Sequence, residues 1–360
     1  MPERALARVD TLAIERNCRV LKPAAAELCA VVKADGYGHG AEQAARAALR
    51  GGAGWIAVAT AREAVQLRER GVTARLLVMG ALTRADAALA AGADADVVAW
   101  TPELLEMLPG HARVHVKLDS GMGRLGTKDP QEALALCDRI AADERLELAG
   151  LMTHFATADE RGDDHFPAQL ERFGELVREV RSRHPDVVVH AANSAASLRD
   201  PLAHFDMVRC GVGIYGLDPF QGEPAASGLA PALSLESYVA AVKRFEPGDS
   251  AGYGRRWRAG EPTWVGVLPI GYGDGWRRGL SNNCDVLVGG QRHPLVGTVS
   301  MDNITIDLGP DSGVRPGDEA VLIGRQGDEV ILCEEVARRL DTINYEVTCG
   351  LSQRVPREYL

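Results

Sequence analysis

Residues 28–40 read LCAVVKADGYGHG, an apolar, β-branched run that ends in a lysine and passes into a glycine-rich turn. Such a run is typical of a strand that is buried on both faces. Eight runs of this kind, separated by segments with helical spacing, precede residue 220: 28–33, 55–59, 75–79, 97–100, 114–118, 148–153, 187–191 and 207–211. This alternation predicts an α/β fold, a (β/α)8 TIM-type barrel over residues 1–220.

The composition and the hydrophobic pattern of the chain change after residue 219. Glycine and proline become frequent, and short strands replace the helical spacing at 264–268, 284–288 and 320–323. We therefore predict a second, mostly β domain over residues 221–360, interrupted by a helix at 333–340. The last residues, 343–360, are expected to return to the barrel.

Composition limits the class of protein. The 360 residues are 46% hydrophobic and 25% charged, which excludes a disordered chain. The formal net charge of -10 gives no attraction to nucleic acid, and no apolar run approaches the roughly 18 residues of a membrane span. The charged start does not resemble a signal peptide, and the seven cysteines show no C-x-x-C spacing for a metal. These features predict a cytoplasmic protein with reduced core thiols, no metal and no nucleic-acid or membrane partner.

The lysine at the end of the first run is the first candidate for chemistry. In barrels of this kind, functional groups lie at the carboxyl ends of the strands. Near the barrel axis the Lys33 amine would be desolvated and available as a nucleophile or a base. The alternative is a solvated strand end that takes no part in chemistry.

The loops after the seventh and eighth predicted strands add a candidate phosphate site. They read HAANSAA at 190–196 and RCGVGIYG at 209–216. Ser194 offers a hydroxyl, and Gly211 and Val212 can present backbone N–H groups to an anion. Each feature alone is also common in ordinary turns. Together with a lysine, they indicate pyridoxal phosphate.

The motifs in this order resemble the alanine racemase family, whose members combine a pyridoxal-phosphate barrel with a C-terminal β domain. The resemblance covers nearly the whole chain and also includes KLDSGMGRLG at 117–126, THFATAD at 153–159, AGYG at 251–254, GYGDG at 271–275, VSMD at 299–302 and NYEV at 344–347. Two departures stand out. Asp35-Gly36 replaces an expected Asn-Ala, and Arg255-Arg256-Trp257 follows Tyr253 where small residues are common.

The resemblance implies an isomerase that interconverts L-alanine and D-alanine and supplies D-alanine for cell-wall peptidoglycan. Lys33 is expected to bond covalently to the cofactor and to act on the D-alanine side. Tyr253, contributed by a partner subunit, is expected to act on the L-alanine side. Each positioned acid or base typically contributes about 10²–10⁴ in rate. His154 is expected to assist the tyrosine, although it could instead be a core histidine.

The resemblance also places Arg209 against the ring nitrogen of the cofactor. A guanidinium has only donors and keeps its charge, so it would leave that nitrogen unprotonated. We expect this to confine the chemistry to proton exchange and to limit transamination. The alternative for Arg209 is an ordinary ion pair with a surface carboxylate.

The remaining site residues are also implied by the resemblance. The cofactor is expected to contact Tyr37, His190, Ser194, Gly211, Val212 and Tyr345. The substrate carboxylate is expected to bind Arg124 and the backbone at Met301, and Tyr272 with Tyr345 is expected to narrow the entrance. Lys117 is a candidate for carbamylation, which would position Arg124.

A site that needs Lys33 from one chain and Tyr253 from another implies a homodimer. Three alternatives differ in what they would require. A non-catalytic pyridoxal-phosphate carrier would be a single barrel, and a barrel decarboxylase would have a glutamate at the ring nitrogen and a cysteine-bearing acid motif. A broader-specificity racemase, acting on serine or other amino acids, would commonly have an export signal.

Overall fold

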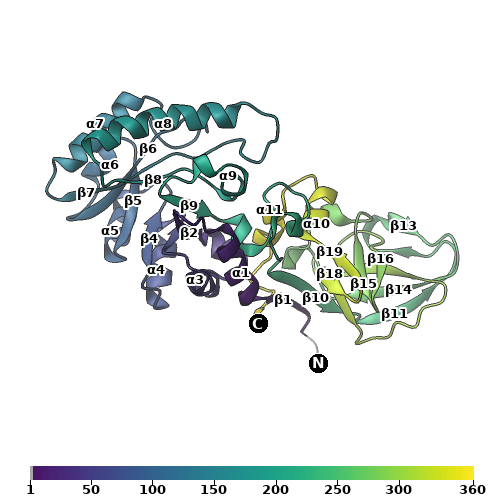
Figure 1. The fold of residues 1–360 in the computed structure, drawn as a ribbon. Coiled ribbons are helices and arrows are strands. Elements are labelled where there is room, and N and C mark those ends of the chain that lie inside the picture. The colour runs from purple at the N-terminus through teal and green to yellow at the C-terminus, as the bar shows by residue number, and fades with distance from the viewer. Residues whose placement is uncertain (1–2) are drawn as a thin grey trace. The chain divides into compact units, whose positions relative to one another are not determined.

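The computed structural model describes residues 3–360, and the chain divides into two compact units (Figure 1). One unit is Leu12–Ala230, and the other is Pro231–Leu360 together with the described residues up to Thr11. This division differs from the predicted one at residue 220. The first strand, β1 (Ala5–Val9), joins the second unit because it pairs with β10 (Leu233–Tyr238).

The first unit is a closed barrel of eight parallel strands, which confirms the predicted fold class. Each predicted run coincides with a strand to within a few residues. The eight strands are β2 (Glu27–Val31), β3 (Trp55–Val58), β4 (Arg75–Val78), β5 (Ala95–Ala99), β6 (Ala112–Lys117), β7 (Leu146–Met152), β8 (Val188–His190) and β9 (Met207–Cys210). The barrel closes where β9 pairs with β2.

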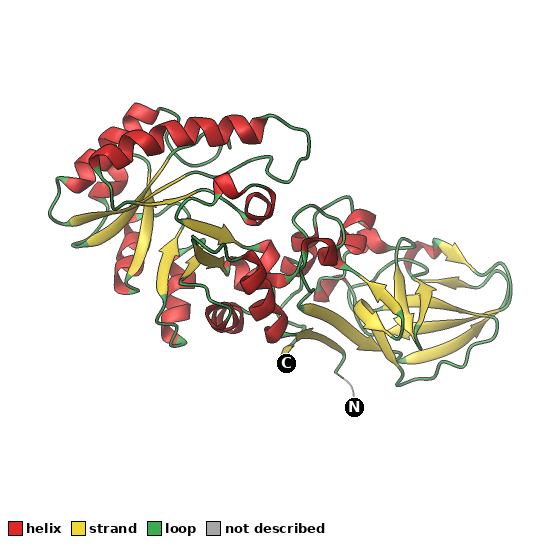
Figure 2. Ribbon diagram, viewed as in Figure 1, coloured by secondary structure: helices red, strands yellow, loops and turns green. Residues whose placement is uncertain are grey.

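Helices connect these strands and surround the barrel (Figure 2). Thr60 and Thr83 begin two of them with capping boxes, each completed by an acidic residue three positions on. The helices are α1 (Thr11–Leu21), α2 (Lys33–Tyr37), α3 (Ala41–Arg50), α4 (Ala61–Glu69), α5 (Arg84–Gly92), α6 (Pro102–Glu106), α7 (Pro130–Ala141), α8 (His165–Arg183) and α9 (Ser194–Arg199).

Alternating side chains of the barrel strands form a buried apolar cluster. Its members include Val31, Leu77, Val98, Met152 and Met207. Because side chains on a strand alternate between its two faces, residues two positions away share the face of these apolar residues. Polar residues at such positions are therefore placed inside the barrel.

The second unit is mostly β, as predicted (Figure 2). Its largest sheet has seven strands in the order β16-β15-β18-β10-β1-β20, with β19 paired to β18. Smaller sheets are β11-β14-β17 and β12-β13. Apart from β1 and β10, the bounds are β11 (Ala241–Phe245), β12 (Ser250–Ala251), β13 (Trp257–Arg258), β14 (Thr263–Leu268), β15 (Asp285–Val288), β16 (Gln291–Pro294), β17 (Ile304–Gly309), β18 (Glu319–Gln326), β19 (Glu329–Ile331) and β20 (Arg357–Tyr359).

The end of the chain forms two short helices and the last strand. Helix α10 (Cys333–Arg339) is present as expected, and α11 (Asn344–Cys349) follows it. The last strand, β20, belongs to the second unit, where it pairs in parallel with β1.

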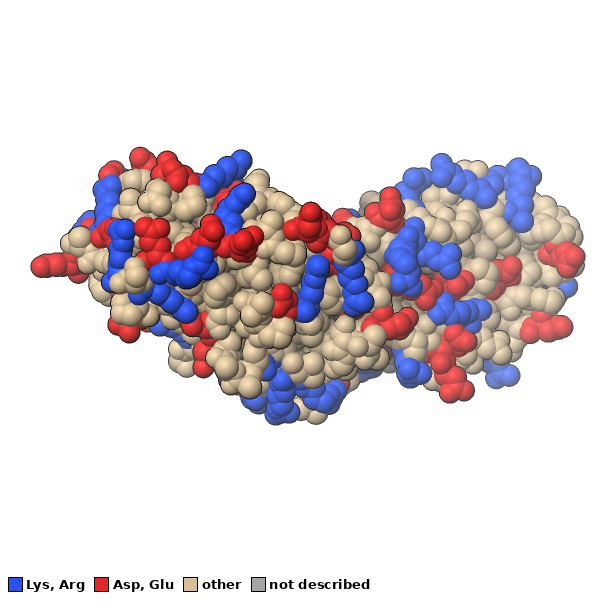
Figure 3. All heavy atoms as spheres, turned by 45° about the horizontal axis from the view of Figure 1, so that its top comes forward, with Lys and Arg blue, Asp and Glu red and all other residues tan. Residues whose placement is uncertain are grey.

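Surface and cysteine chemistry agree with the composition. Basic and acidic side chains are interspersed on the face shown in Figure 3. None of the helices in residues 3–360 combines the length and apolar character that crossing a bilayer requires. No disulfide joins the seven cysteines, which all lie in residues 3–360; six are buried, but Cys349 is exposed and is not the core thiol predicted for it.

Candidate active site

Lys33 lies at the start of an unusual turn. Strand β2 ends at Val31, two residues earlier than predicted, and residues 34–37 all have positive φ, with values of 53°, 51°, 62° and 52°. Left-handed backbone costs about 1–2 kcal/mol for each residue with a side chain. The turn is held by hydrogen bonds, since the Ala34 N–H donates to the Glu63 carboxylate at 2.7 Å and Asp35 accepts from the Ala41 N–H at 2.9 Å. The departure Asp35-Gly36 suits this backbone, because glycine and aspartate tolerate it best.

Next to this turn lie the residues predicted to hold a phosphate. The Lys33 Nζ is 5.9 Å from the centre of the Tyr37 ring. A Cβ at Gly211 would be 2.4 Å from the Tyr37 hydroxyl oxygen, so a larger residue there would displace the Tyr37 ring. The buried Ser194 hydroxyl accepts hydrogen bonds from the N–H groups of Gly211 and Gly213, both at 3.1 Å. Val212 begins the following 3-10 turn, η2 (Val212–Tyr215).

Arg209 is buried inside the barrel and makes hydrogen bonds through both terminal nitrogens. Its Nη1 donates to His190 Nδ1 at 2.8 Å. Its Nη2 donates to the carbonyls of Thr153 at 2.7 Å and Ala191 at 3.0 Å, and lies 3.2 Å from His154 Nδ1. Burial lowers the pKa of Arg209 to about 10, which still leaves it charged at neutral pH. The alternative of a surface ion pair is therefore wrong.

His154 contacts this guanidinium and is kept neutral. Burial, followed by the charges of Arg209 and Arg124, lowers the pKa of His154 well below its usual value. The charges of Lys117 and Lys33 act in the same direction. Because Nδ1 faces a donor, the remaining ring nitrogen carries the proton of the neutral ring.

Lys117 lies in the same positively charged region. Its side chain is buried, and burial together with the charges of Arg209 and Arg124 lowers its pKa to about 8. Four cationic side chains are close enough to lower the pKa of His154 by their charges: Lys33, Lys117, Arg124 and Arg209. Three of them also lower the pKa of Lys117. Such a cluster of cations is suited to anionic ligands.

The loop that carries Arg124 is ordered by Asp119. This carboxylate accepts hydrogen bonds from the N–H groups of Gly121 at 3.1 Å, Gly123 at 3.0 Å and Arg124 at 3.1 Å. Burial opposes ionisation, but these backbone donors lower the pKa of Asp119 below its usual value. Asp119 belongs to the segment KLDSGMGRLG at 117–126, but no role was predicted for it.

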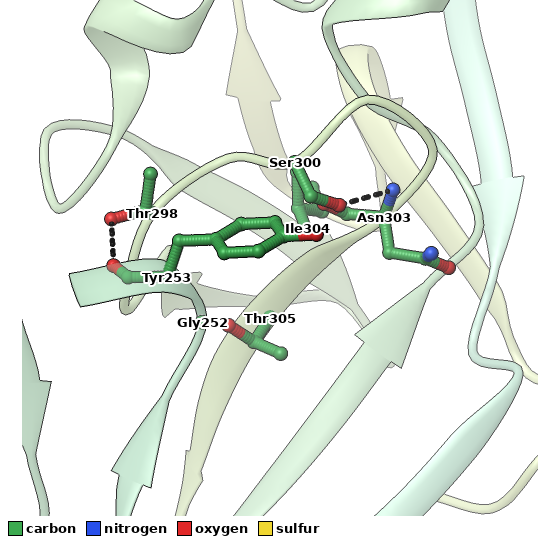
Figure 4. A pocket seen from close by; sticks show the side chains of 7 residues that line it. All are labelled: Gly252, Tyr253, Thr298, Ser300, Asn303, Ile304 and Thr305. Carbon is green, nitrogen blue, oxygen red and sulfur yellow. Dashed lines mark hydrogen bonds between the residues drawn. The ribbon is translucent and has the colours of Figure 1, made fainter. Parts of the chain in front are cut away.

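The second unit holds the other predicted residues. Tyr253 lines an open pocket of about 390 Å³ with Gly252, Thr298, Ser300, Asn303, Ile304 and Thr305. Figure 4 shows its side chain in this pocket, where the Tyr253 carbonyl accepts a hydrogen bond of 2.8 Å from the Thr298 hydroxyl. Gly252 has a φ of +69°, and a Cβ there would be 2.9 Å from the Thr298 nitrogen. The close packing of Gly252 against the Thr298 backbone therefore fixes the position of the Tyr253 backbone.

Tyr272 and Met301 are brought together by backbone pairing. The Tyr272 N–H donates to the Ser300 carbonyl at 3.0 Å, and the Gly273 N–H donates to the Met301 carbonyl at 2.9 Å. Both side chains are exposed, so neither Tyr272 nor Met301 is part of the core of the second unit. Tyr345 lies on α11, where its N–H donates to the side chain of Asn344.

Two buried polar residues in the barrel were missed. His115 lies on β6 and contacts His190, and Asp96 lies on β5 and contacts His115. The available signal was a polar residue inside an otherwise apolar run, at the spacing that places it on the inner face.

These features define a two-domain barrel enzyme whose polar groups gather at the strand ends, the class that includes isomerases of amino acids. Two family models match, "Alanine racemase, N-terminal domain" over residues 9–219 and "Alanine racemase, C-terminal domain" over residues 232–359. The chain belongs to the alanine racemase family, as the motifs predicted. The match to the C-terminal model disfavours the single-barrel carrier.

Relatives and solved structures agree with this assignment. The chain is 46% identical over 353 residues to alanine racemase of Geobacillus stearothermophilus, covering 95% of this chain and 89% of the relative. It is 42% identical to alanine racemase 1 of Bacillus subtilis, covering 98% and 92%. The alanine racemase structure from E. faecalis superposes with a TM-score of 0.93 at 38% identity, covering 99% of this chain and 98% of that one. The chain is accordingly an amino-acid racemase, an isomerase.

Proposed function

We propose that this protein interconverts L-alanine and D-alanine by exchanging the proton on Cα, with pyridoxal phosphate held in the barrel unit. One observation carries the proposal. A buried, charged arginine is fixed by His190 and backbone carbonyls at the strand ends, within the electrostatic cluster that also contains Lys33. An arginine in this position suits proton exchange better than amino-group transfer.

The residues present fit the cofactor. Its phosphate and phenolate are anionic, and four cationic side chains gather in the region. The close approach of Tyr37 to Gly211, which a side chain would block, and the buried Ser194 hydroxyl supply a compact cradle for the phosphate. We assign Lys33 as the covalent attachment point and Tyr37, Ser194, Gly211, Val212 and Tyr345 as phosphate contacts. When bound, pyridoxal phosphate supplies the electron sink that acidifies the Cα proton.

The proton chemistry belongs to two residues of the protein. The Lys33 amine takes or returns the Cα proton on the D-alanine side, and Tyr253 of the partner subunit does so on the L-alanine side. Each group contributes about 10²–10⁴ in rate when it is correctly positioned. His154 supports the tyrosine as a proton acceptor, because its ring is kept neutral.

Arg209 and His190 define the electronic environment. The guanidinium of Arg209 offers only N–H donors, so a ring nitrogen that faces it accepts a hydrogen bond and stays unprotonated. His190 accepts from the other side of the same guanidinium and holds it in place. We propose that this arrangement limits amino-group transfer.

Substrate binding is assigned to residues of both units. Arg124 and the backbone at Met301 are proposed to bind the carboxylate of alanine, and Tyr272 with Tyr345 to limit the size of the side chain. The Lys117 amine, with its pKa lowered to about 8, is partly neutral near physiological pH and can react with carbon dioxide. We propose that the resulting carbamate orients Arg124.

The complete enzyme is proposed to be a homodimer in the cytoplasm that supplies D-alanine for peptidoglycan. The exposed positions of Tyr253, Tyr272 and Met301 support a dimer, because these side chains need a covering partner to act. The six buried cysteine thiols support a reducing compartment.

A direct assay tests the proposal. Purified protein is incubated with L-alanine, with and without added pyridoxal phosphate, and optical rotation is followed to racemic equilibrium. L-serine in a parallel reaction tests the broader-specificity alternative. Borohydride is expected to abolish the cofactor absorbance and to leave the reduced cofactor attached covalently to Lys33. No change in rotation, or a reduced cofactor attached to another lysine, would contradict the proposal.

A further inference from the structure

A hydrogen-bonded chain of side chains runs from Arg209 across the interior of the barrel. His190 Nε2 lies 2.7 Å from His115 Nδ1, and His115 Nε2 lies 3.0 Å from Asp96 Oδ2. Arg209, His190, His115 and Asp96 are all buried. His190 is the last residue of β8, whereas Asp96 is the second residue of β5, so the chain extends from the carboxyl ends of the strands toward their amino ends.

The far end of this chain is anchored by two arginines. Arg75 donates to Asp96 Oδ2 at 2.8 and 3.0 Å, and Arg113 donates to Asp96 Oδ1 at 2.6 Å. The Arg75 guanidinium also lies 4.1 Å from the centre of the Trp55 ring, which packs nearly perpendicular to the His115 ring at a centroid distance of 5.7 Å. Asp96 is thus surrounded by donors, which requires it to be an acceptor at both oxygens.

Only one arrangement of protons satisfies every contact. Burial opposes ionisation of Asp96, but His115, Arg75 and Arg113 hold its pKa at about 2, so it is a carboxylate that can only accept. His115 must then donate from Nε2, and burial lowers its pKa and keeps the ring neutral with a lone pair on Nδ1. His190 must in turn donate from its Nε2 to that lone pair. This leaves the Nδ1 lone pair of His190 to accept from Arg209.

The opposite arrangement fails at both ends. With the protons on the Nδ1 atoms, His190 would direct an N–H at the N–H of Arg209, and His115 would direct a lone pair at a carboxylate. Buried polar groups without a partner are strongly disfavoured. The His115 ring occupies the space that the missing side chain of Gly150 leaves, since a Cβ there would lie 2.0 Å from His115 Nδ1.

We propose that Asp96 and His115 are positioning residues for racemisation. Asp96 sets the direction of the proton chain, His115 transmits it to His190, and His190 thereby presents a lone pair that holds the Arg209 guanidinium in its orientation. The role in catalysis rests on the proposed function, in which Arg209 faces the cofactor. The proton positions themselves do not depend on it.

The first measurement uses the wild-type holoenzyme labelled with ¹⁵N-histidine, by two-bond ¹H–¹⁵N NMR, with signals assigned from His→Gln variants. We expect His115 and His190 both to be neutral, with the proton on Nε2. A proton on Nδ1 of His190, or a doubly protonated ring, would overturn the proposal. The proton positions are read from the wild-type protein, and the variants serve only to assign its signals.

The second measurement compares Asp96→Asn with Asp94→Asn. Asp94 is exposed and contacts Arg113 at 2.8 Å, so its replacement removes a neighbouring carboxylate that has no contact with the histidines. We expect Asp96→Asn to shift the His190 nitrogen signals. It should also lower kcat per cofactor-loaded site by about 10–100-fold, with KM for alanine little changed. This is the range seen when the hydrogen-bond partner that orients a functional histidine is removed. Asp94→Asn should change neither.

A third variant, Gly150→Ala, displaces the His115 ring without removing any polar group, and its effect should follow that of Asp96→Asn. Unchanged His190 signals in Asp96→Asn, or a loss of activity equal to that of Asp94→Asn, would overturn the proposal. A protein with the predicted proton positions but no racemisation of alanine would contradict the proposed function and not the proton arrangement.

Discussion

Several candidate site residues of the barrel unit are buried, whereas three of those in the β unit are exposed. In the barrel, Ser194, Arg209 and Lys117 are 2%, 3% and 6% exposed. In the β unit, Tyr253 is 74% exposed, and Met301 and Tyr272 are 51% and 43% exposed. The barrel therefore holds a preorganised polar site, whereas the β unit displays reactive and apolar side chains at its surface. An exposed phenol becomes useful only when another surface covers it, which is the physical basis for proposing a shared site.

Replacing Lys33 should have the largest effect. Lys33→Ala removes both the attachment point and one proton-transfer group, so racemase activity should fall by at least about 10⁴-fold. Lys22→Ala, at an exposed lysine bonded to the Gly52 carbonyl, is the matched control and should keep full activity. Initial rates at saturating L-alanine measure both variants. More than a tenth of native activity in Lys33→Ala would be inconsistent with the assigned role.

Tyr253→Phe should separate activity from stability. Loss of one acid/base group should lower kcat by about 10²–10⁴-fold. Because the side chain is exposed, the free energy of unfolding should change by no more than about 0.5 kcal/mol. Tyr359→Phe, at another exposed tyrosine of the same unit, is the control. Equal activities of the two variants would argue against a role for the Tyr253 hydroxyl.

Arg209→Glu tests the electronic role of the barrel arginine. Racemisation should fall by about 10²–10³-fold, the range for loss of one preorganised donor, while transamination to pyruvate should rise. Arg209→Lys keeps the positive charge and should not increase transamination. The ratio of pyruvate formed to alanine racemised is the measurement. An unchanged ratio in Arg209→Glu would reject the hypothesis.

Lys117 should have a smaller effect, visible in the pH dependence of stability. The pKa of Lys117 is about 8 in the folded protein and 10.5 when unperturbed. Between these pH values the unfolded chain binds more protons than the folded protein. The stability of the wild-type protein should therefore rise with pH across this window. Below pH 8 the buried charge costs about 3 kcal/mol. Lys117→Met removes this cost, so its stability advantage should shrink between pH 8 and about 10.5.

This comparison requires urea unfolding in buffer free of carbon dioxide, since carbamylation would remove the titration. Lys128→Met, at an exposed lysine, should show no such trend. A constant difference between wild type and Lys117→Met across the window would show that the amine is not desolvated as described.

Much of the barrel could be predicted because its signals are local. Apolar runs and helical spacing give each strand and helix separately, and all eight predicted runs are strands. Strand β1 was missed, since its five residues pair with Leu233–Tyr238, more than 200 positions away. The left-handed turn after Val32 was also beyond reach, because it depends on the Glu63 carboxylate, which accepts from the Ala34 N–H, and on the Ala41 N–H, which donates to Asp35.

The site was predictable to a different extent. The motifs pointed to Lys33, Ser194 and Arg209, and all three residues lie in the barrel unit. His115 and Asp96 were not found, because a polar residue in a strand acquires meaning only when barrel closure brings it against polar residues from other strands. Whether Tyr253 completes the site is a question about two chains, which depends on assembly and not on local pattern.

The most direct test mixes two inactive chains. Lys33→Ala and Tyr253→Ala, each with a different affinity tag, are coexpressed, and dimers that carry both tags are isolated. Such a dimer has one complete site of two if Lys33 and Tyr253 of the partner subunit act together, so about half of wild-type activity per dimer should return. Mixed dimers that bind pyridoxal phosphate and remain inactive would contradict the account.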